Sequence, residues 1–266
     1  MPHINLRHSP LAGGPAEIYY RDYGSGLPLV FLHGGWGYEI YPVDVQWPAL
    51  KHTRLLIPDR SGYGRSTKPA LFGADFHHRA VTETLLFLDA MSLEKCIFWG
   101  HSDGAVIAAL LGIAAPERCL GLVMEAFHYD RAKPHSRKFF EDMASDPESF
   151  GTRVAEVLRR EHGEPYWKDL VRSEGQAWLD IARAAESGPA DLFDGKLSRL
   201  RVPALFLHGA EDPRTEPGEL DQVRCELPAA TFHVISRGGH SPHSESASEA
   251  EFERALGEAV QAWSRR

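Results

Sequence analysis

A serine between two glycines carries the strongest chemical signal in this sequence. The pentapeptide GHSDG at 100–104 follows the apolar run 96–99 directly and opens an apolar stretch that ends before Pro116. This context predicts a strand, a very tight turn and a helix. Such a turn strains the serine backbone, typically with φ above zero, and favours glycine two residues away on either side because side chains there would collide. The helix N-terminus would direct free N–H groups at a developing oxyanion, so we predict that Ser102 is a nucleophile.

A serine nucleophile needs a general base, and the pKa of histidine suits this role near neutral pH. Residue type alone does not select one of the 14 histidines. His240 follows two glycines just beyond the predicted strand 231–235, in a loop at the C-terminal end of that strand. Open α/β sheets build their sites at this edge. We therefore expect His240 to be the base, with His243 as the nearest alternative.

A carboxylate must orient the imidazole and stabilise the imidazolium. Asp212 lies shortly after the predicted strand 204–207, and the proline that follows it favours a turn. Glu125, at the end of another predicted strand, is the alternative acid. We expect Asp212 to be the acid, which gives the chain order serine, acid, histidine.

The elements that would position these residues alternate between strand-like and helix-like segments. Strands are predicted at 16–23, 29–32, 55–57, 96–99, 120–124, 204–207 and 231–235, and helices at 76–91, 102–115 and 247–263. The short, wholly apolar runs are typical of strands buried on both faces. The alternation predicts an α/β fold with a mostly parallel sheet and helices on both faces.

One block interrupts the alternation. Residues 127–196 show helical patterns divided by prolines, and no convincing strand. We interpret this block as a helical lid inserted into a core domain formed by residues 1–126 and 197–266. Several aromatic and histidine side chains are candidates to line a cavity beneath the lid, although each could instead pack the lid onto the core: Trp36, Tyr38, Phe127, His128, Trp167 and Trp178.

The composition is that of a globular protein large enough to bury its own core. The chain has 266 residues, a net charge of −8 and 43% hydrophobic residues. Its longest apolar run, 104–115, is shorter than the ~20 residues of a membrane-spanning helix. No secretory signal is visible, and the three cysteines lack metal spacing. We expect a cytoplasmic monomer or homodimer without metal or organic cofactor, and the acidic charge argues against nucleic-acid and membrane partners.

Together with two further motifs, these features resemble the α/β-hydrolase superfamily, of the lipase/esterase-like kind with a helical lid. The tetrapeptide HGGW at 33–36, directly after a buried strand, is similar to the oxyanion loop of that family. The octapeptide DRSGYGRS at 59–66 is similar to its D-x-x-G-x-G-x-S turn. The resemblance implies an eight-stranded sheet and an oxyanion hole formed by the backbone N–H groups of Gly35 and Asp103.

The resemblance also implies a serine hydrolase that cleaves a small carboxylic ester through an acyl-enzyme on Ser102. Haloalkane dehalogenases and epoxide hydrolases are disfavoured, because they carry an aspartate where Ser102 stands. The alternatives are hydrolysis of an amino-acid ester or amide, hydrolysis of a C–C bond, or a non-catalytic receptor on the same scaffold. The Asp103 carboxylate bears on the first alternative, since it could attract a cationic substrate group or else stabilise the helix N-terminus.

Overall fold

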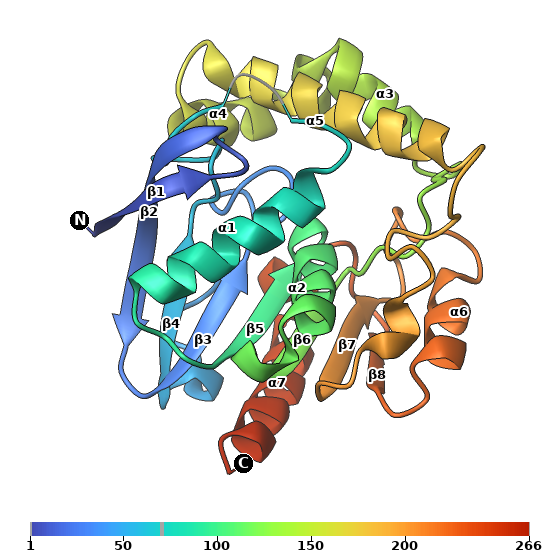
Figure 1. Cartoon of the computed structure of the whole chain (residues 1–266). Coiled ribbons are helices and arrows are strands. Elements are labelled where there is room, and N and C mark those ends of the chain that lie inside the picture. Colours follow the sequence, from blue (N-terminus) through green and yellow to red (C-terminus); the bar gives the residue numbers. More distant parts are fainter. Residues whose placement is uncertain (1, 70–71, 266) are drawn as a thin grey trace.

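A single sheet runs through the molecule (Figure 1). Within residues 2–69 and 72–265, which the computed structural model describes, its eight strands are β1 (His3–Ser9), β2 (Gly14–Gly24), β3 (Leu27–Leu32), β4 (Thr53–Pro58), β5 (Cys96–His101), β6 (Cys119–Glu125), β7 (Ala204–Gly209) and β8 (Thr231–Ile235). Their order is β1-β2-β4-β3-β5-β6-β7-β8. β2 pairs antiparallel with β1 and β4, and all other neighbours pair in parallel. The predicted mostly parallel, eight-stranded sheet is confirmed.

Helices cover both faces of this sheet, as the alternation of segments predicts. In β3, Leu32 packs into one hydrophobic cluster and Phe31 into another, because successive side chains of a strand point to opposite faces. The first cluster lies under α1 (Phe76–Ala90) and α2 (Asp103–Ala114), and the second lies under α7 (Glu249–Trp263). Figure 1 shows α1 and α2 in front of the sheet and α7 behind it.

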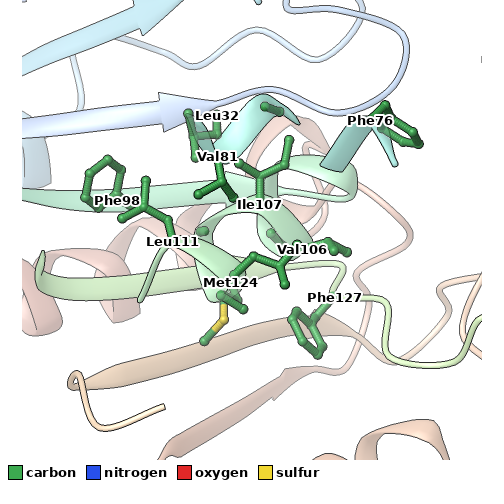
Figure 2. Close-up of a cluster of buried hydrophobic side chains, with 14 of the residues drawn as sticks. Leu32, Phe76, Val81, Phe98, Val106, Ile107, Leu111, Met124 and Phe127 are labelled. Atoms are coloured by element: carbon green, nitrogen blue, oxygen red, sulfur yellow. The ribbon is translucent and has the colours of Figure 1, made fainter. Parts of the chain in front are cut away.

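The helix α2 is apolar on all sides, and the strands and helices around it bury these sides. Figure 2 shows Ile107 of this helix among Leu32, Phe98 and Met124 of the strands and Val81 of α1. These side chains are at most 6% exposed. A helix that is hydrophobic all round is stable in water only when neighbours bury every face. The packing of α2 therefore fixes the position of its N-terminus, which begins directly after Ser102.

The segment 127–196, between β6 and β7, contains α3 (Arg137–Ser145), α4 (Thr152–His162) and α5 (Tyr166–Ala184). We call residues 127–196 the helical segment. Figure 1 shows its three α-helices together at one end of the sheet. Beyond it, α6 (Glu219–Glu226) connects β7 to β8. Among the described residues, no helix has the length and apolarity needed to cross a membrane.

Candidate active site

Ser102 lies in the tight turn between β5 and α2. Its backbone has φ 55° and ψ −118°, the strained conformation that the glycine pattern predicts. A Cβ atom on Gly104 would overlap the carbonyl oxygen of Leu32, and one on Gly100 would overlap the backbone of Gly104. The Ser102 N–H also donates to the carbonyl oxygen of Glu125 at 2.9 Å. Close packing of β3, β5 and α2 therefore explains why both flanking positions are glycine.

His240 and Asp212 form a buried pair at the same edge of the sheet. Nδ1 of His240 lies 2.9 and 3.0 Å from the two carboxylate oxygens of Asp212. The backbone N–H of Arg214 also donates to this carboxylate, at 2.9 Å. Because Nδ1–H donates to Asp212, Nε2 of His240 is left as a hydrogen-bond acceptor. The structure thus brings together the predicted acid and the predicted base.

Burial opposes ionisation of both members of this pair. For Asp212, the interactions with His240 outweigh burial and hold the pKa of the carboxyl well below its usual range. For His240, burial and the nearby charge of Arg214 outweigh the carboxylate and lower the pKa of the imidazole. At neutral pH the pair is therefore a carboxylate and a neutral imidazole, the state that a general base requires.

The Ser102 hydroxyl makes its hydrogen bond to a different histidine. Its Oγ lies 3.3 Å from Nε2 of His128, and among the described residues it makes no hydrogen bond to His240. The two imidazole rings stack with centroids 5.8 Å apart, and both line the pocket into which Ser102 opens. Burial and the charge of Lys133 lower the pKa of His128 well below its usual value, so this ring is neutral. The sequence marks His128 as a pocket candidate, but no motif indicates its contact with Ser102.

The alternative acid and base, Glu125 and His243, contact each other and not the nucleophile's hydroxyl. Nδ1 of His243 lies 2.8 and 2.9 Å from the carboxylate oxygens of Glu125. Trp99 Nε1 donates to the same carboxylate at 3.0 Å, and Nε2 of His243 donates to the carbonyl oxygen of Tyr41 at 2.9 Å. Both members are fully buried beneath the site. Their hydrogen bonds are satisfied within this pair, which leaves neither free to serve Ser102.

The loop after β3 lies directly against the nucleophile turn. A Cβ atom on Gly34 would come within 3.2 Å of Cβ of Ser102, and one on Gly35 within 2.7 Å of Oδ2 of Asp103. The Arg60 guanidinium donates to the carbonyl oxygens of His33 and Gly34 and so fixes this loop. Among the described residues, the backbone N–H groups of Gly35 and Asp103 have no hydrogen-bond partner. Two unpaired donors therefore lie beside Ser102, as an oxyanion hole requires.

The pocket above Ser102 contains three of the six predicted lining residues, namely Trp36, His128 and Trp178. The other three do not line the pocket. Each packs against neighbouring side chains instead, which was the alternative that the sequence left open. Tyr38 contacts Phe31 in the cluster beneath α7. Phe127 stacks on Phe193 with ring centroids 5.4 Å apart. Trp167 is fully buried within the helical segment.

Two ionisable residues that no sequence motif indicates also line this pocket. Arg214 follows Asp212 by two positions, and Glu174 precedes the predicted Trp178 by one helical turn of α5. One carboxyl oxygen of Glu174 accepts a hydrogen bond from the Tyr63 hydroxyl, and the other is buried without a partner. Burial raises the pKa of Glu174 well above its usual value. The i, i+4 spacing from Trp178 was the one available signal for Glu174.

The carboxylate of Asp103 joins three helices at the floor of the pocket. Its Oδ1 lies 2.9 Å from Nε2 of His77 on α1 and 3.1 Å from Nε1 of Trp178 on α5. All three side chains are buried. The helical segment is thus attached to the residue next to the nucleophile. Among the described residues, no group of three or more histidine, cysteine or acidic side chains is arranged to hold a metal ion.

This fold and site define a class of protein, and the comparison with family models agrees. The model described as "Alpha/beta hydrolase family" matches residues 29–254. The match spans most of the 266 residues, so the chain belongs to the α/β-hydrolase family and is a hydrolase.

Individual relatives are hydrolases of several kinds. A protein of Azorhizobium caulinodans that is provisionally named carbamate hydrolase RutD is 29% identical over 253 residues, covering 86% of this chain and 90% of that protein. The 2-hydroxy-6-oxo-2,4-heptadienoate hydrolase of Pseudomonas putida is 27% identical over 257 residues, covering 86% and 88%. The structure of a meta-cleavage product hydrolase from Pseudomonas fluorescens IP01 superposes with a TM-score of 0.70 at 22% identity, over 98% of each chain. At this level of identity, the likeness to the solved structure shows the fold alone.

Proposed function

We propose that this hydrolase cleaves a small carboxylic ester through an acyl-enzyme on Ser102. One observation carries the proposal. The strained Ser102 turn opens into the same pocket as the His240 imidazole, whose Nδ1 is held 2.9 Å from Asp212. A strained nucleophile, an oriented base and unpaired backbone donors are the parts that acyl transfer needs.

The neutral His128 leaves the proton of the nucleophile available to the base. With its proton on Nε2, His128 donates to a lone pair of Ser102 Oγ, 3.3 Å away. Nδ1 of His128, buried without a partner, is then an unpaired acceptor, which costs less than an unpaired N–H donor. The hydroxyl proton of Ser102 is free to turn toward the accepting Nε2 of His240.

In the first half-reaction, Ser102 Oγ attacks the ester carbonyl while His240 takes its proton. The backbone N–H groups of Gly35 and Asp103 stabilise the oxyanion. His240 then protonates the leaving alcohol. In the second half-reaction, water attacks the acyl-enzyme with His240 again as base, and the released acid regenerates Ser102. Asp212 stays ionised throughout, since its pKa lies well below its usual range.

We propose that the helical segment serves as the lid of this site. Trp178 binds the Asp103 carboxylate, and Glu161 at the end of α4 accepts the backbone N–H groups of Tyr38 at 2.8 Å and Glu39 at 3.0 Å. These contacts join the segment to the nucleophile turn and to the loop that follows Gly35. Closing the pocket would exclude bulk water and strengthen the oxyanion hydrogen bonds.

The experiment that tests the function is replacement of Ser102 with alanine. We expect turnover of a panel of p-nitrophenyl esters to fall by about a million-fold, the scale of other triad knockouts. A fluorophosphonate should label the wild-type protein and not Ser102→Ala. The control is Ser187→Ala at an exposed serine, which should match the wild type. Retained ester hydrolysis in pure Ser102→Ala protein would refute the assignment, and labelling without turnover of any ester would point to another acyl or C–C substrate.

The amino-acid ester alternative has its own test. Hydrolysis of a phenylalanine ester is compared with that of its des-amino analogue, in the wild type and in Asp103→Asn. The hydrogen bonds that Asp103 already accepts from His77 and Trp178 favour a structural role for this carboxylate. Equal rate ratios in both proteins would end the alternative.

A further inference from the structure

A guanidinium without an ion-pair or hydrogen-bond partner lines the pocket of Ser102. Among the described residues, Arg214 is the only lysine or arginine of the pocket lining, and its guanidinium forms no ion pair or hydrogen bond with the protein. Its backbone is fixed, since the Arg214 N–H donates to the Asp212 carboxylate. The backbone of Arg214 is therefore held beside Asp212, while the donors of its guanidinium stay without an acceptor in the described part of the chain.

Aromatic rings hold this guanidinium in place. Its central carbon lies 4.0 Å from the ring centroid of Phe139 and 5.9 Å from that of Trp36. Stacking on an aromatic face orients the guanidinium plane and leaves its N–H donors free at the edge. A planar fork of free donors matches the two oxygens of a carboxylate.

Trp36 provides an independent sign of a missing acceptor in the same pocket. Its indole Nε1 is buried and has no hydrogen-bond partner. A buried N–H without an acceptor destabilises a protein, so such donors are rare unless water or a ligand satisfies them. Trp36 and Arg214 line one pocket and contact each other through the cation–π interaction. The missing partner of both is an oxygen acceptor.

The acidic side chains of the pocket do not cancel the charge of Arg214. The Asp103 carboxylate already binds His77 and Trp178. Burial raises the pKa of Glu174 well above its usual value, which keeps this side chain neutral. The buried Arg60 guanidinium, which interacts with both acids, offsets the charge of Asp103. Among the described residues that line the pocket, Arg214 is therefore the cation whose side-chain donors no acidic side chain accepts.

We infer that Arg214 and Trp36 bind a carboxylate of the substrate, so that the ester cleaved at Ser102 belongs to an anionic compound such as a half-ester of a dicarboxylic acid. The ester part of this inference rests on the proposed function, whereas the carboxylate site does not depend on it. The carboxylate lies either in the acyl group or in the leaving alcohol, and matched substrates separate the two cases.

The test compares kcat/KM for two pairs of esters that differ in one carboxylate. Monomethyl adipate against methyl hexanoate carries it in the acyl group, and 4-carboxyphenyl butyrate against phenyl butyrate carries it in the alcohol. A charge-assisted hydrogen bond to a carboxylate corresponds to a preference of roughly tenfold to a hundredfold. We expect this preference in one of the pairs for the wild type, and its loss in Arg214→Met, which keeps an apolar stem on Phe139. A wild type that prefers the neutral member of both pairs would overturn the inference.

Two further variants separate a specific contact from a change of net charge. Arg7→Met removes one positive charge at an exposed residue of β1 and should keep the wild-type ratio. Arg214→Glu should reverse the selectivity toward an ester that carries an ammonium group. If Arg7→Met lowers the ratio as much as Arg214→Met does, the preference is a property of the overall charge and the inference fails.

A binding measurement makes failure of the inference distinguishable from failure of the proposed function. Calorimetric titration with phenylacetate should show binding to the wild type, with affinity at least tenfold weaker for phenylacetamide and for Arg214→Met. If no ester is hydrolysed but phenylacetate binds in this Arg214-dependent way, the ester assignment falls and the carboxylate site stands. If esters are hydrolysed but phenylacetate and phenylacetamide bind with equal affinity, the carboxylate site falls and the ester assignment stands.

Discussion

Replacing Glu125 with glutamine removes the charge of a fully buried ion pair and keeps the shape of the side chain. The carboxylate accepts hydrogen bonds from Nδ1 of His243 at 2.8 and 2.9 Å, from the His243 backbone N–H at 3.1 Å and from Nε1 of Trp99 at 3.0 Å. A glutamine has one acceptor oxygen in place of two. Its amide NH₂ group would face a donor, so at least one buried N–H loses its partner.

The size of the effect follows from these contacts. Breaking a buried charge pair costs about 3–5 kcal/mol. The imidazole of His243 can escape part of this cost by becoming neutral, and the glutamine retains one acceptor. We therefore expect Glu125→Gln to lower the free energy of unfolding by about 3 kcal/mol, the lower end of that range.

The pH dependence of this loss has a defined sign. His243 lowers the pKa of Glu125 below its ordinary value of 4.5 despite burial, so the carboxylate stabilises the fold above pH 4.5 and loses this effect as pH falls through its lowered pKa. Glu125 raises the pKa of His243 above 6.5 despite burial, so the imidazolium stabilises the fold below pH 6.5 and loses this effect as pH rises through its raised pKa. Both contributions are complete between pH 4.5 and 6.5, where the variant should differ most from the wild type.

Urea unfolding followed by circular dichroism at pH 6 and at higher pH measures the difference. The matched control is Glu258→Gln, at an exposed glutamate of α7, which should change the free energy of unfolding by less than about 0.5 kcal/mol. If Glu125→Gln has the stability of this control at pH 6, the pair contributes nothing and the electrostatic reasoning is wrong.

Two remaining predictions concern the nucleophile turn and the base. Gly104→Ala should lower the free energy of unfolding by about 3 kcal/mol, because its Cβ would overlap the carbonyl oxygen of Leu32 in β3. An unchanged thermal midpoint would contradict this, and Gly14→Ala, whose Cβ would contact nothing within 4 Å, is the control. The kcat/KM for a neutral ester should decrease as pH falls through the lowered pKa of His240, since protonation removes the base. A decrease of kcat/KM centred above pH 6.5 would contradict the lowered pKa of His240.

Most strands could be predicted because burial leaves a local trace in the sequence. The strands β3 and β5 are apolar runs, since helices cover both of their faces. The first strand, β1, escaped the pattern reading because it lies at the sheet edge with most of its side chains exposed. The pattern predicts seven strands, and only the resemblance implied one more, which is β1.

The residues of the candidate site also divide into those that local sequence signals select and those whose role only the structure shows. Ser102, Asp212 and His240 each follow a strand directly or in a short loop, so local signals were enough to select them. The sequence left Glu125 and His243 open as alternatives, because both also follow strands. Only the structure shows that these two bind each other at 2.8 Å, a contact between residues 118 positions apart.

The sequence by itself determined what depends on neighbouring residues: a strand, a strained turn between glycines and a helix that together expose a serine. The tertiary structure alone decided which distant side chains share the pocket. It placed His128 against Ser102 and Arg214 over Phe139, and it buried Tyr38, Phe127 and Trp167 in packing contacts instead. The physical reason is that an aromatic side chain is equally apolar in a core and in a pocket wall. Its role is therefore set by the packing of elements far apart in the chain, which no local pattern encodes.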